Sequence, residues 1–549
     1  MVNDPANSPL AARAASDFGA ETRLRGAAAW ALVLLALAPF HLIHAAHFLR
    51  LHPQGGEPTG FLFADMPYYV ANGRAIFERG NGFAYPNPYD PDPDSPVIYF
   101  HWYIWILGAG VVKLGLEPGT WFLATGAIAA LAFGRLTLAL VGRFTPTRRW
   151  QAWVFLVAMW GGGVAAASQV VSNVFARRPV AEHLLALDPY EGHWCLQWGR
   201  NVVYPTESLY HALVVAAWLA ALRGRGGLAT LFAALVAATH PFTGCELLAM
   251  LGLWWLWRGS SRRDAAWVRE GALLGAVCLV FVGYNFGYLD RFEAHRELRR
   301  AWAKDWTATA RQQFAGYGPV VALAAARVLR DLRAGRRLDA DGKFMATAAA
   351  TAFLLSNHQW FLSPHQPLHF TRGYVWLPLL LLGLPALEDL AAAIGARIAA
   401  PLHGPLAVLA LIAASLDNIV FIHRNTRGAA FEQLYLAPGE KEVLREFKER
   451  PSGGIALVIN SKLSYLATTY APVRTWLGHL HNTPRFAARR EDVGHWLETG
   501  EAGEWFKRIE AIATPVEREL PGLDPADWEV AFESARWRIL KRRTAPVKK

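Results

Sequence analysis

Long apolar blocks, separated by short charged segments, constrain the fold of this chain more than any other feature. Their residues carry few charges, and the longest reach the roughly 20 residues that a helix needs to cross a bilayer. The blocks are Ala27–Phe48, Thr120–Val141, Gln151–Val171, Ser208–Leu222, Gly271–Tyr284, Met345–Leu355, Val375–Leu387 and Pro405–Ile422. Lipid offers the backbone no hydrogen-bond partners, and the blocks lack the alternation of barrel strands. We therefore predict an α-helical polytopic membrane protein.

The composition agrees with this prediction and narrows the partners. Of the 549 residues, 53% are hydrophobic and only 18% are charged, which is too apolar for a soluble enzyme of this length. The net charge of +11 could suggest nucleic acid, but many basic residues flank apolar blocks, where membrane orientation explains them. We expect the lipid bilayer as a partner and no nucleic acid.

Charge asymmetry orients the predicted helices. Arg13, Arg23 and Arg25 precede the first apolar block, which indicates a cytoplasmic tail over residues 1–26 and a retained first helix rather than a cleaved signal. The segment Tyr99–Leu116 is expected to lie flat at the membrane interface. If it crossed, the next basic cluster would stand outside, against the positive-inside rule.

A second exception to simple alternation is the stretch Leu228–Trp257. Basic residues flank both of its ends, so we expect a hairpin of two short helices with its tip at Thr239–Gly244. The whole membrane domain, 27–423, then has about eleven spans, with a structured first outer loop at 51–119. An odd number places residues 424–549 outside the cytoplasm, in the periplasm of a bacterial inner membrane or its equivalent.

Residues 424–549 have the composition of a soluble domain. Hydrophobic periodicity predicts two helices and four strands there. They are helices at Lys441–Arg450 and Asp492–Glu498, and strands at Ile455–Ile459, Val473–Leu477, Trp528–Phe532 and Ala535–Leu540. We expect a small α/β domain.

The most informative polar residue, Asp65, follows the first helix directly, within Phe63-Ala64-Asp65-Met66-Pro67-Tyr68-Tyr69. A carboxylate at the membrane edge, among aromatic residues, can serve as a general base. The alternative is that Asp65 caps a helix over Pro67–Arg79, whose proline stands just inside the helix start. The residue pattern leaves both roles open.

This pattern resembles the first outer loop of GT-C glycosyltransferases. The acidic residue is followed by Pro67-Tyr68-Tyr69, a helix, Gly80-Asn81-Gly82 and an aromatic juxtamembrane segment. The likeness is greatest to the branch that includes protein O-mannosyltransferases and the aminoarabinose transferases of lipid A. The stretch from Tyr470 to His479, followed by Asn482-Thr483-Pro484, is similar to a stretch in the terminal domains of that branch.

The resemblance implies an enzyme that takes a sugar from a polyprenyl phosphate or diphosphate and passes it, usually with inversion, to a glycan, lipid or protein acceptor on the outer face. In that family the acidic residue of the loop is the general base or contacts the acceptor, and Asp65 is the matching position. The usual acidic residue after it is Met66 here, which weakens a metal-dependent mechanism. We expect no obligatory zinc and leave open whether a divalent cation, Mg²⁺ or Mn²⁺, assists.

Such chemistry also needs a cation to hold the departing phosphate. Arg372 lies between two predicted spans with His365 and His369 nearby, and a guanidinium can bind phosphate through two nitrogens. Its alternative role is an interfacial arginine that reaches lipid headgroups. In the predicted outer segment Asp290–Arg311, Arg296 and its basic neighbours could bind the donor phosphate or anionic lipid.

Four further residues are candidates for substrate binding: Tyr68, His101, Glu207 and His240. Glu207 opens a predicted span, so capping that helix is the simpler interpretation. His240 stands at the hairpin tip, where a lone histidine beside a proline is more often structural. Asp417-Asn418, near the outer end of the last predicted span, could help form the site or could end the helix.

Competing classes of function make different demands on the sequence. Zinc chemistry is not indicated, because His183, His193, His365 and His369 lack helical spacing with a supporting carboxylate. A transporter or flippase would carry its polar residues within spans, whereas here they concentrate in the predicted outer loops and no inverted repeat is visible. A non-catalytic membrane scaffold is the third class, and it should tolerate replacement of Asp65 by Asn.

Overall fold

The computed structural model describes residues 24–49, 56–63, 65–180, 182, 196–259, 264–302, 305–427, 435–450 and 454–543. The chain divides into two compact units. The membrane unit comprises Met1–Ile43, Gly126–Leu279 and Ala303–Arg427, and the mixed unit comprises His44–Thr125, Val280–Trp302 and Gly428–Lys549. The mixed unit therefore combines the predicted first outer loop, 51–119, with the predicted domain 424–549. The exact boundaries of those predicted domains stay predictions.

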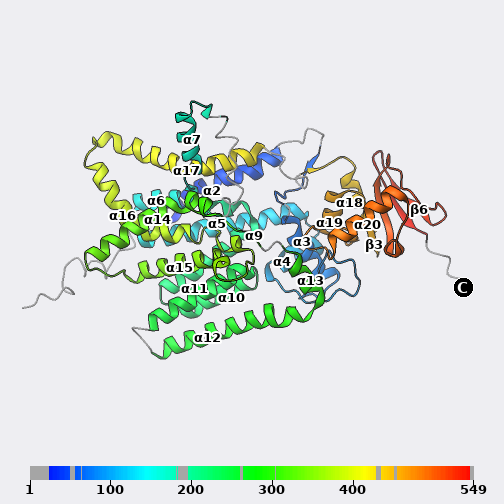
Figure 1. The fold of residues 1–549 in the computed structure, drawn as a ribbon, viewed down its shortest axis with the longest axis horizontal. Coiled ribbons are helices and arrows are strands. Elements are labelled where there is room, and N and C mark those ends of the chain that lie inside the picture. The colour runs from blue at the N-terminus through cyan, green and yellow to red at the C-terminus, as the bar shows by residue number, and fades with distance from the viewer. Residues whose placement is uncertain are drawn as a thin grey trace, which may run out of the picture. The chain divides into compact units, whose positions relative to one another are not determined.

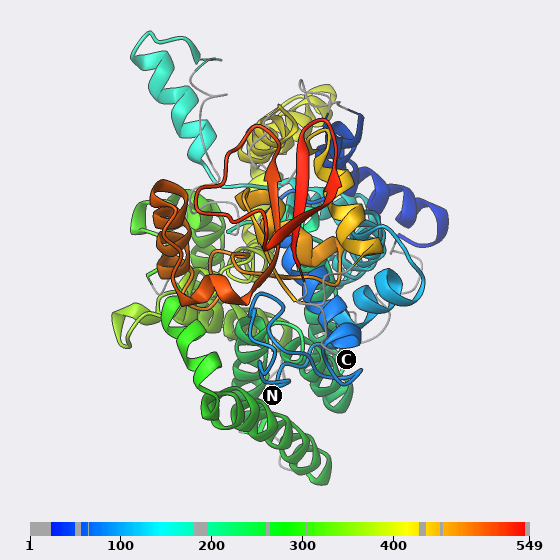
Figure 2. The same ribbon diagram turned by 90° about the vertical axis from the view of Figure 1, so that its right-hand side faces the viewer.

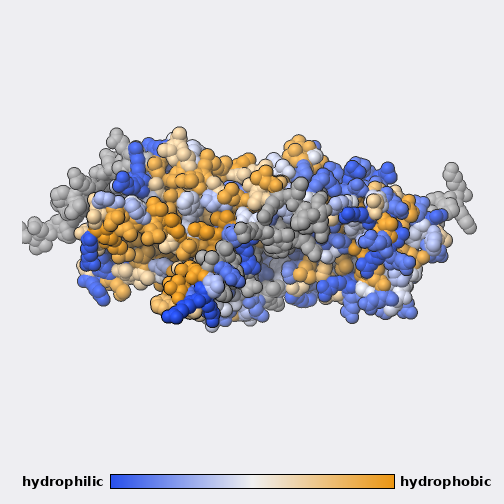
Figure 3. Space-filling view, turned by 90° about the horizontal axis from the view of Figure 1, so that it is seen from above, coloured by the Kyte–Doolittle hydropathy of each residue, from blue (hydrophilic) through white to orange (hydrophobic). Residues whose placement is uncertain are grey.

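Five helices of the described residues are long and apolar enough to cross a membrane. They are α2 (Gly26–Leu49), α5 (Pro118–Phe144), α12 with the turns that follow it (Ala265–Arg291), α16 (Trp376–Gly395) and α17 with the turn before it (Ala400–Thr426) (Figure 1). Exposed apolar side chains on α17, such as Val408 and Leu409, belong to a surface suited to lipid. Figure 3 shows a broad hydrophobic surface over the helical part of the chain. The predicted class, a multi-pass helical membrane protein, is confirmed.

The predicted number of about eleven spans is not confirmed. The membrane unit also contains the helices α9 (Pro205–Leu222), α10 (Gly226–Ala237), α11 (Pro241–Gly259), α14 (Ala310–Arg333) and α15 (Ala340–Ser356). Most side chains of α9 are buried in the protein, and such a helix needs no uniformly apolar surface. The predicted pair of short helices around the tip at Thr239–Gly244 is present as α10 and α11, which pack together (Figure 1).

One predicted span is wrong in form. The block Gln151–Val171 is two helices, α6 (Arg148–Trp160) and α7 (Ala165–Phe175), which meet at 76°. Three successive glycines, 161–163, form the break, and the backbone of a neighbour lies against one of them: a Cβ on Gly163 would stand 1.9 Å from the carbonyl oxygen of Ala315. Hydropathy averaged over the block hides this break.

The segment predicted to lie flat at the interface is a short helix. It consists of α4 (Trp102–Gly108) and a π-helical turn, Ala109–Lys113, together 12 residues. At about 1.5 Å per residue this helix spans roughly 18 Å, less than the hydrocarbon thickness of a bilayer. Its place at the membrane surface stays a prediction.

The C-terminal part of the mixed unit is the expected small α/β domain. Its sheet has the order β4-β3-β5-β7-β6, with β4, β3 and β5 parallel and the β5–β7–β6 neighbours antiparallel (Figure 2). The strands are β3 (Ile455–Val458), β4 (Arg474–Thr475), β5 (Ile509–Pro515), β6 (Trp528–Glu533) and β7 (Trp537–Arg542), and the helices are α18 (Glu440–Glu449), α19 (Ser461–Tyr470) and α20 (Phe486–Thr499). The sequence did not predict β5, the central strand, or α19.

The first loop and this domain are tied together inside the mixed unit. Helix α3 (Met66–Glu78) packs on both α4 and α19, and the two-residue strands β1 (Glu57–Pro58) and β2 (Tyr435–Leu436) pair antiparallel. The side chain of Arg79 donates to the carbonyl of Val473 over 2.8 Å. The first loop and the C-terminal domain therefore belong to one compact unit.

Candidate functional site

Asp65 occupies the N-cap position of α3, but its side chain makes no capping hydrogen bond. Its carboxylate instead lies 3.2 Å from Nε2 of His479, which belongs to the C-terminal domain of the same unit. The Asp65 side chain is 75% exposed, whereas that of His479 is 5% exposed. The Asp65 carboxylate is thus exposed to an incoming molecule, and the buried ring of His479 contacts it from the protein interior.

Three tyrosines pack around that buried ring. The centroids of Tyr68, Tyr89 and Tyr465 lie 5.5, 5.7 and 5.1 Å from that of His479. Burial raises the pKa of all three phenols, and the negative charge of Asp65 acts in the same direction on Tyr68 and Tyr465. The phenols therefore stay protonated at neutral pH and cannot serve as bases.

His101 has a structural role in the same unit. It caps α4, with its side chain accepting a hydrogen bond from the backbone N–H of Ile104. Burial lowers the pKa of His101 to about 4, so the ring is neutral at pH 7 and can accept. Its ring also contacts Tyr69 edge-on. Substrate binding by His101 stays a prediction.

Arg296 lies on α13 (Glu293–Ala301), where acidic neighbours compensate its charge. It pairs with Glu293 and donates to the carbonyl oxygen of Asp290. Arg299 pairs with Asp290, and Arg300 pairs with Glu293. These ion pairs compensate part of the positive charge of the helix. Lys304, another basic residue of the predicted segment, lies outside the described residues. Binding of an anion by Arg296 stays a prediction.

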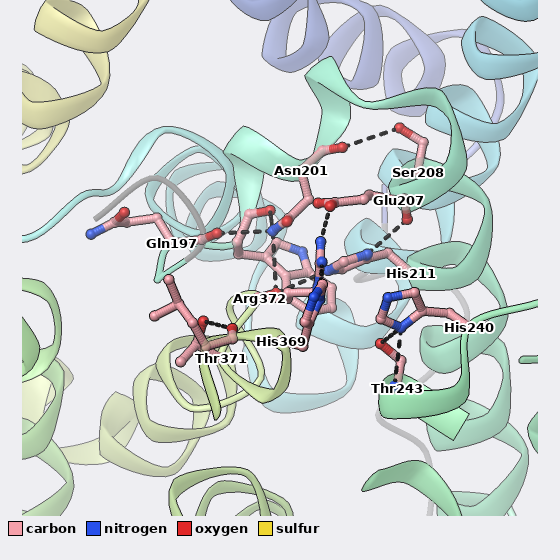
Figure 4. A network of polar contacts seen from close by, with 12 residues as sticks. Gln197, Asn201, Glu207, Ser208, His211, His240, Thr243, His369, Thr371 and Arg372 are labelled. Carbon is pink, nitrogen blue, oxygen red and sulfur yellow. Dashed lines mark hydrogen bonds and ion pairs between the residues drawn. The ribbon is translucent and has the colours of Figure 1, made fainter. Parts of the chain in front are cut away.

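A second polar cluster lies within the membrane unit (Figure 4). Arg372 forms an ion pair with Glu207 of α9, and both side chains are almost fully buried. Nη2 of Arg372 lies 2.6 Å from Nδ1 of His369. Glu207 is in the first turn of its helix, as predicted, but its carboxylate is held by an arginine instead of serving only the helix end.

The backbone of Arg372 is fixed as firmly as its side chain. Its φ of 22° lies in the left-handed region that most non-glycine residues avoid. Nε2 of His211 lies 2.9 Å from its carbonyl oxygen, and Nδ2 of Asn201 donates to the same oxygen over 3.1 Å (Figure 4). His211 and Asn201, which the sequence analysis did not single out, therefore position the arginine.

The predicted histidines gather around the same cluster. The ring of Phe242 stacks on His369 with centroids 4.5 Å apart, and on His365 at 5.7 Å. His240 stacks on Tyr210 at 4.7 Å and has its Nδ1 2.9 Å from the Thr243 hydroxyl. Five predicted residues thus share one cluster: Glu207, His240, His365, His369 and Arg372.

Asp417 and Asn418 do not end their helix, and a part in the site stays a prediction. Helix α17 (His403–Arg427) continues well past them, and both side chains are buried. Asp417 accepts from the backbone N–H of Ala166 over 2.6 Å, and Asn418 donates to the carbonyl of Trp160 over 2.7 Å. Both side chains satisfy backbone groups at the break between α6 and α7.

Metal-ligating residues do not cluster within the part of the chain that the structure describes. His183 and His193, weighed above as zinc ligands, are outside that part. Whether a divalent cation assists the reaction stays open.

Comparison with known proteins gives matches among solved structures. No protein-family model matches the chain, and neither does any curated protein sequence. ArnT from Cupriavidus metallidurans bound to undecaprenyl phosphate matches with 14% identity over 94% of this chain and 98% of that chain, with a TM-score of 0.42. Its apo structure matches with 14% identity over 93% and 97% of the two chains, also with a TM-score of 0.42.

Arabinofuranosyltransferase AftD from mycobacteria also matches. Its identity is 12%, its TM-score is 0.44, and it covers 95% of this chain but 40% of its own. These structural neighbours are glycosyltransferases. They include the branch that the sequence resembles. At identities of 12–14% these likenesses concern the fold alone.

Proposed function

We propose that this protein is an integral membrane glycosyltransferase that moves a sugar from a polyprenyl phosphate or diphosphate to an acceptor on the outer face of the membrane. The observation that carries this proposal is Asp65. Its carboxylate is exposed, does not cap its helix and is contacted by His479. A capping residue would not need an exposed carboxylate held by a second side chain, and neither would a scaffold. A general base needs such exposure, because it must reach the proton of the acceptor.

The reaction follows as one displacement. Asp65 takes the proton from a hydroxyl of the acceptor. At the same time the oxygen of that hydroxyl forms a bond to the anomeric carbon of the sugar. The bond from that carbon to the donor phosphate oxygen breaks, and the electron pair leaves with the phosphate. Attack opposite to the departing group inverts the anomeric configuration.

Arg372 is our candidate for holding the departing phosphate. A guanidinium presents several donors in one plane and stabilises the charge that grows on the phosphate. In the structure this side chain pairs with Glu207, so a phosphate would have to exchange with that carboxylate. The neighbouring His369 could donate to the same anion once Glu207 moves aside.

The sidedness is part of the proposal. The charge rule places the first loop and the terminal domain outside, in the periplasm of a bacterial inner membrane. Their union in one unit supports a common side for both, and it requires an even number of crossings between them. Accessibility of a cysteine introduced at Asp94 to a membrane-impermeant thiol reagent in intact cells tests that side directly.

Lipid mass spectrometry of cells with and without the gene tests the activity. Cells that lack the gene should accumulate a polyprenyl-linked sugar, and the wild-type gene should remove it. Asp65→Asn should fail to remove it, whereas Asp94→Asn, which changes an exposed acid in the same loop, should act like the wild type. Clearance by Asp65→Asn, or no accumulation with an unchanged surface glycan profile, would favour a transporter or scaffold.

A further inference from the structure

We propose that His479 is the positioning residue for the Asp65 base, and that it acts as a neutral ring with its single proton on Nε2. This inference rests on the proposed function and extends it to the C-terminal domain. Nothing in the sequence pattern assigns His479 a role, although it ends the stretch from Tyr470 that resembles the terminal domains of the family. Three polar contacts of the His479 ring carry the assignment.

The tautomer follows from the other ring nitrogen. Nδ1 of His479 accepts a hydrogen bond from the backbone N–H of His481 over 3.0 Å, and Nδ2 of Asn482 lies 3.1 Å away. A backbone N–H can only donate, so Nδ1 must offer its lone pair and carry no proton. The neutral ring then has its proton on Nε2, which lies 3.2 Å from Oδ1 of Asp65 and donates to it.

This arrangement assigns the two residues different tasks. Nε2 of His479 already carries a proton, and Nδ1 accepts hydrogen bonds from the backbone N–H of His481 and the side chain of Asn482. The ring therefore cannot take a proton from Asp65. The proton that leaves the hydroxyl of the sugar-accepting molecule stays on the Asp65 carboxylate. A donor hydrogen bond favours the ionised carboxylate, so His479 keeps the base ready at lower pH and fixes its direction.

Further contacts within the mixed unit keep Nε2 of His479 directed at Asp65. Gly478 lies against Tyr89, since a Cβ there would stand 2.5 Å from its ring. On the opposite side of the contact, the backbone N–H of Tyr68 donates to the hydroxyl of Tyr465 over 3.1 Å, and Thr469 donates to the carbonyl of Pro67 over 3.2 Å. The start of α3, where Asp65 sits, is thus bonded to the helix that packs beside the histidine.

Two polar substitutions separate positioning from packing. In His479→Asn the short amide can still accept from His481 but cannot reach Asp65. In His479→Gln the longer side chain can place an N–H where Nε2 was. His495→Asn is the matched control, because His495 is 59% exposed on the same domain and lies 3.9 Å from Glu501. Asp65→Asn is measured beside them.

The assay uses the purified full-length protein in lipid vesicles. The probe is the polyprenyl-linked sugar fraction extracted from cells that lack the gene, supplied with the delipidated envelope fraction of the same cells as acceptor. Loss of the lipid-linked sugar is followed by mass spectrometry between pH 4.5 and pH 8. The folded state of each variant is checked by size-exclusion chromatography and thermal unfolding.

His479→Asn should lower turnover at pH 6 by about 10- to 100-fold, the effect of losing a hydrogen bond to a charged group. The acid limb of its pH–rate profile should move to higher pH by about one unit, because the carboxylate loses the donor that favours ionisation. His479→Gln should restore most of the activity and the wild-type acid limb. A purely structural histidine would change the yield of folded protein without moving that limb.

The outcomes distinguish this inference from the proposed function. If Asp65→Asn is inactive while His479→Asn behaves like the wild type, the positioning role is wrong and the glycosyltransferase proposal stands. If His479→Gln is as inactive as Asp65→Asn, the histidine itself is the base and the inference is overturned. If His479→Asn does not fold, His479→Gln decides alone, since a wild-type acid limb supports the donor role. Activity of Asp65→Asn would reject the function itself.

Discussion

The carboxylate of Glu207 and the guanidinium of Arg372 form an ion pair in which the two side chains are only 8% and 5% exposed. It joins α9 to the segment between α15 and α16, two parts of the chain separated by more than a hundred residues in sequence. A buried pair of this kind gains little net free energy over apolar residues, but the loss of one partner leaves an uncompensated charge.

Arg372→Met should therefore lower the free energy of unfolding by about 3–5 kcal/mol, since Glu207 remains buried without its cation. The double variant Glu207→Leu with Arg372→Met should recover much of that loss. Thermal or denaturant unfolding in detergent measures both. The control is Arg143→Met, which breaks a pair with Asp341 whose side chains are 30% and 24% exposed and should cost about 1 kcal/mol or less. An equal cost for the two single variants would contradict this account.

Close contact of α3 with α4 predicts a strong effect at Gly108. A Cβ on Gly108 would lie 2.0 Å from the carbonyl oxygen of Gly73, closer than any real contact. Gly108→Ala should push the helices apart and destabilise the mixed unit by about 1–3 kcal/mol, in the range of other overpacked cores. Gly494→Ala, on α20 with open space around its Cβ, should instead stabilise by about 0.5–1 kcal/mol. Opposite shifts in melting temperature are the expected result.

His101 predicts a pH dependence of stability. Its folded-state pKa is about 4, below the ordinary value of 6.5, because burial disfavours the charged ring. Between these values the unfolded chain binds a proton that the folded chain does not, so stability should fall as the pH drops from 6.5 towards 4. His101→Asn keeps a capping side chain and removes the titration. The melting temperature should depend less on pH in this variant between pH 7 and pH 4.5, and an unchanged dependence would assign it to other groups.

The sequence predicted those elements whose patterns are local. The first apolar block was placed within one residue at each end of α2, and the basic flanks of Leu228–Trp257 indicated α10 and α11 correctly. Strand β5 was missed because it begins with Ile509-Glu510 directly after a charged stretch, although it becomes the centre of the sheet through pairing on both sides. Pairing of this kind is a property of the folded chain.

The candidate sites show the same division. Asp65 stood out as a carboxylate among aromatic residues directly after the first apolar block, and Arg372 stood out as an arginine beside two histidines between two predicted spans. Their partners His479 and Glu207 lie 414 and 165 positions away along the chain, and a pattern of neighbours cannot show such contacts. His479 offered one signal, its place in the stretch that resembles the terminal domains of the family. The two residues of α17 were noticed as polar, yet the break that they serve is visible only once α6 and α7 are seen apart.

The break between α6 and α7 predicts that replacement of Asp417 destabilises the membrane unit. A bend of 76° between α6 and α7 interrupts the helical hydrogen bonds, and lipid could not replace them. Asp417 accepts a hydrogen bond from the backbone N–H of Ala166 at the start of α7. It also packs closely on the glycine break, since a Cβ on Gly162 would lie 2.6 Å from the Cβ of Asp417. Asp417→Ala should therefore destabilise the membrane unit by about 1–3 kcal/mol through one unsatisfied buried N–H, whereas Asp417→Asn keeps an acceptor and should cost less. Thermal unfolding in detergent compares the two, and equal losses would mean that the negative charge, rather than the hydrogen bond, holds α7 in place.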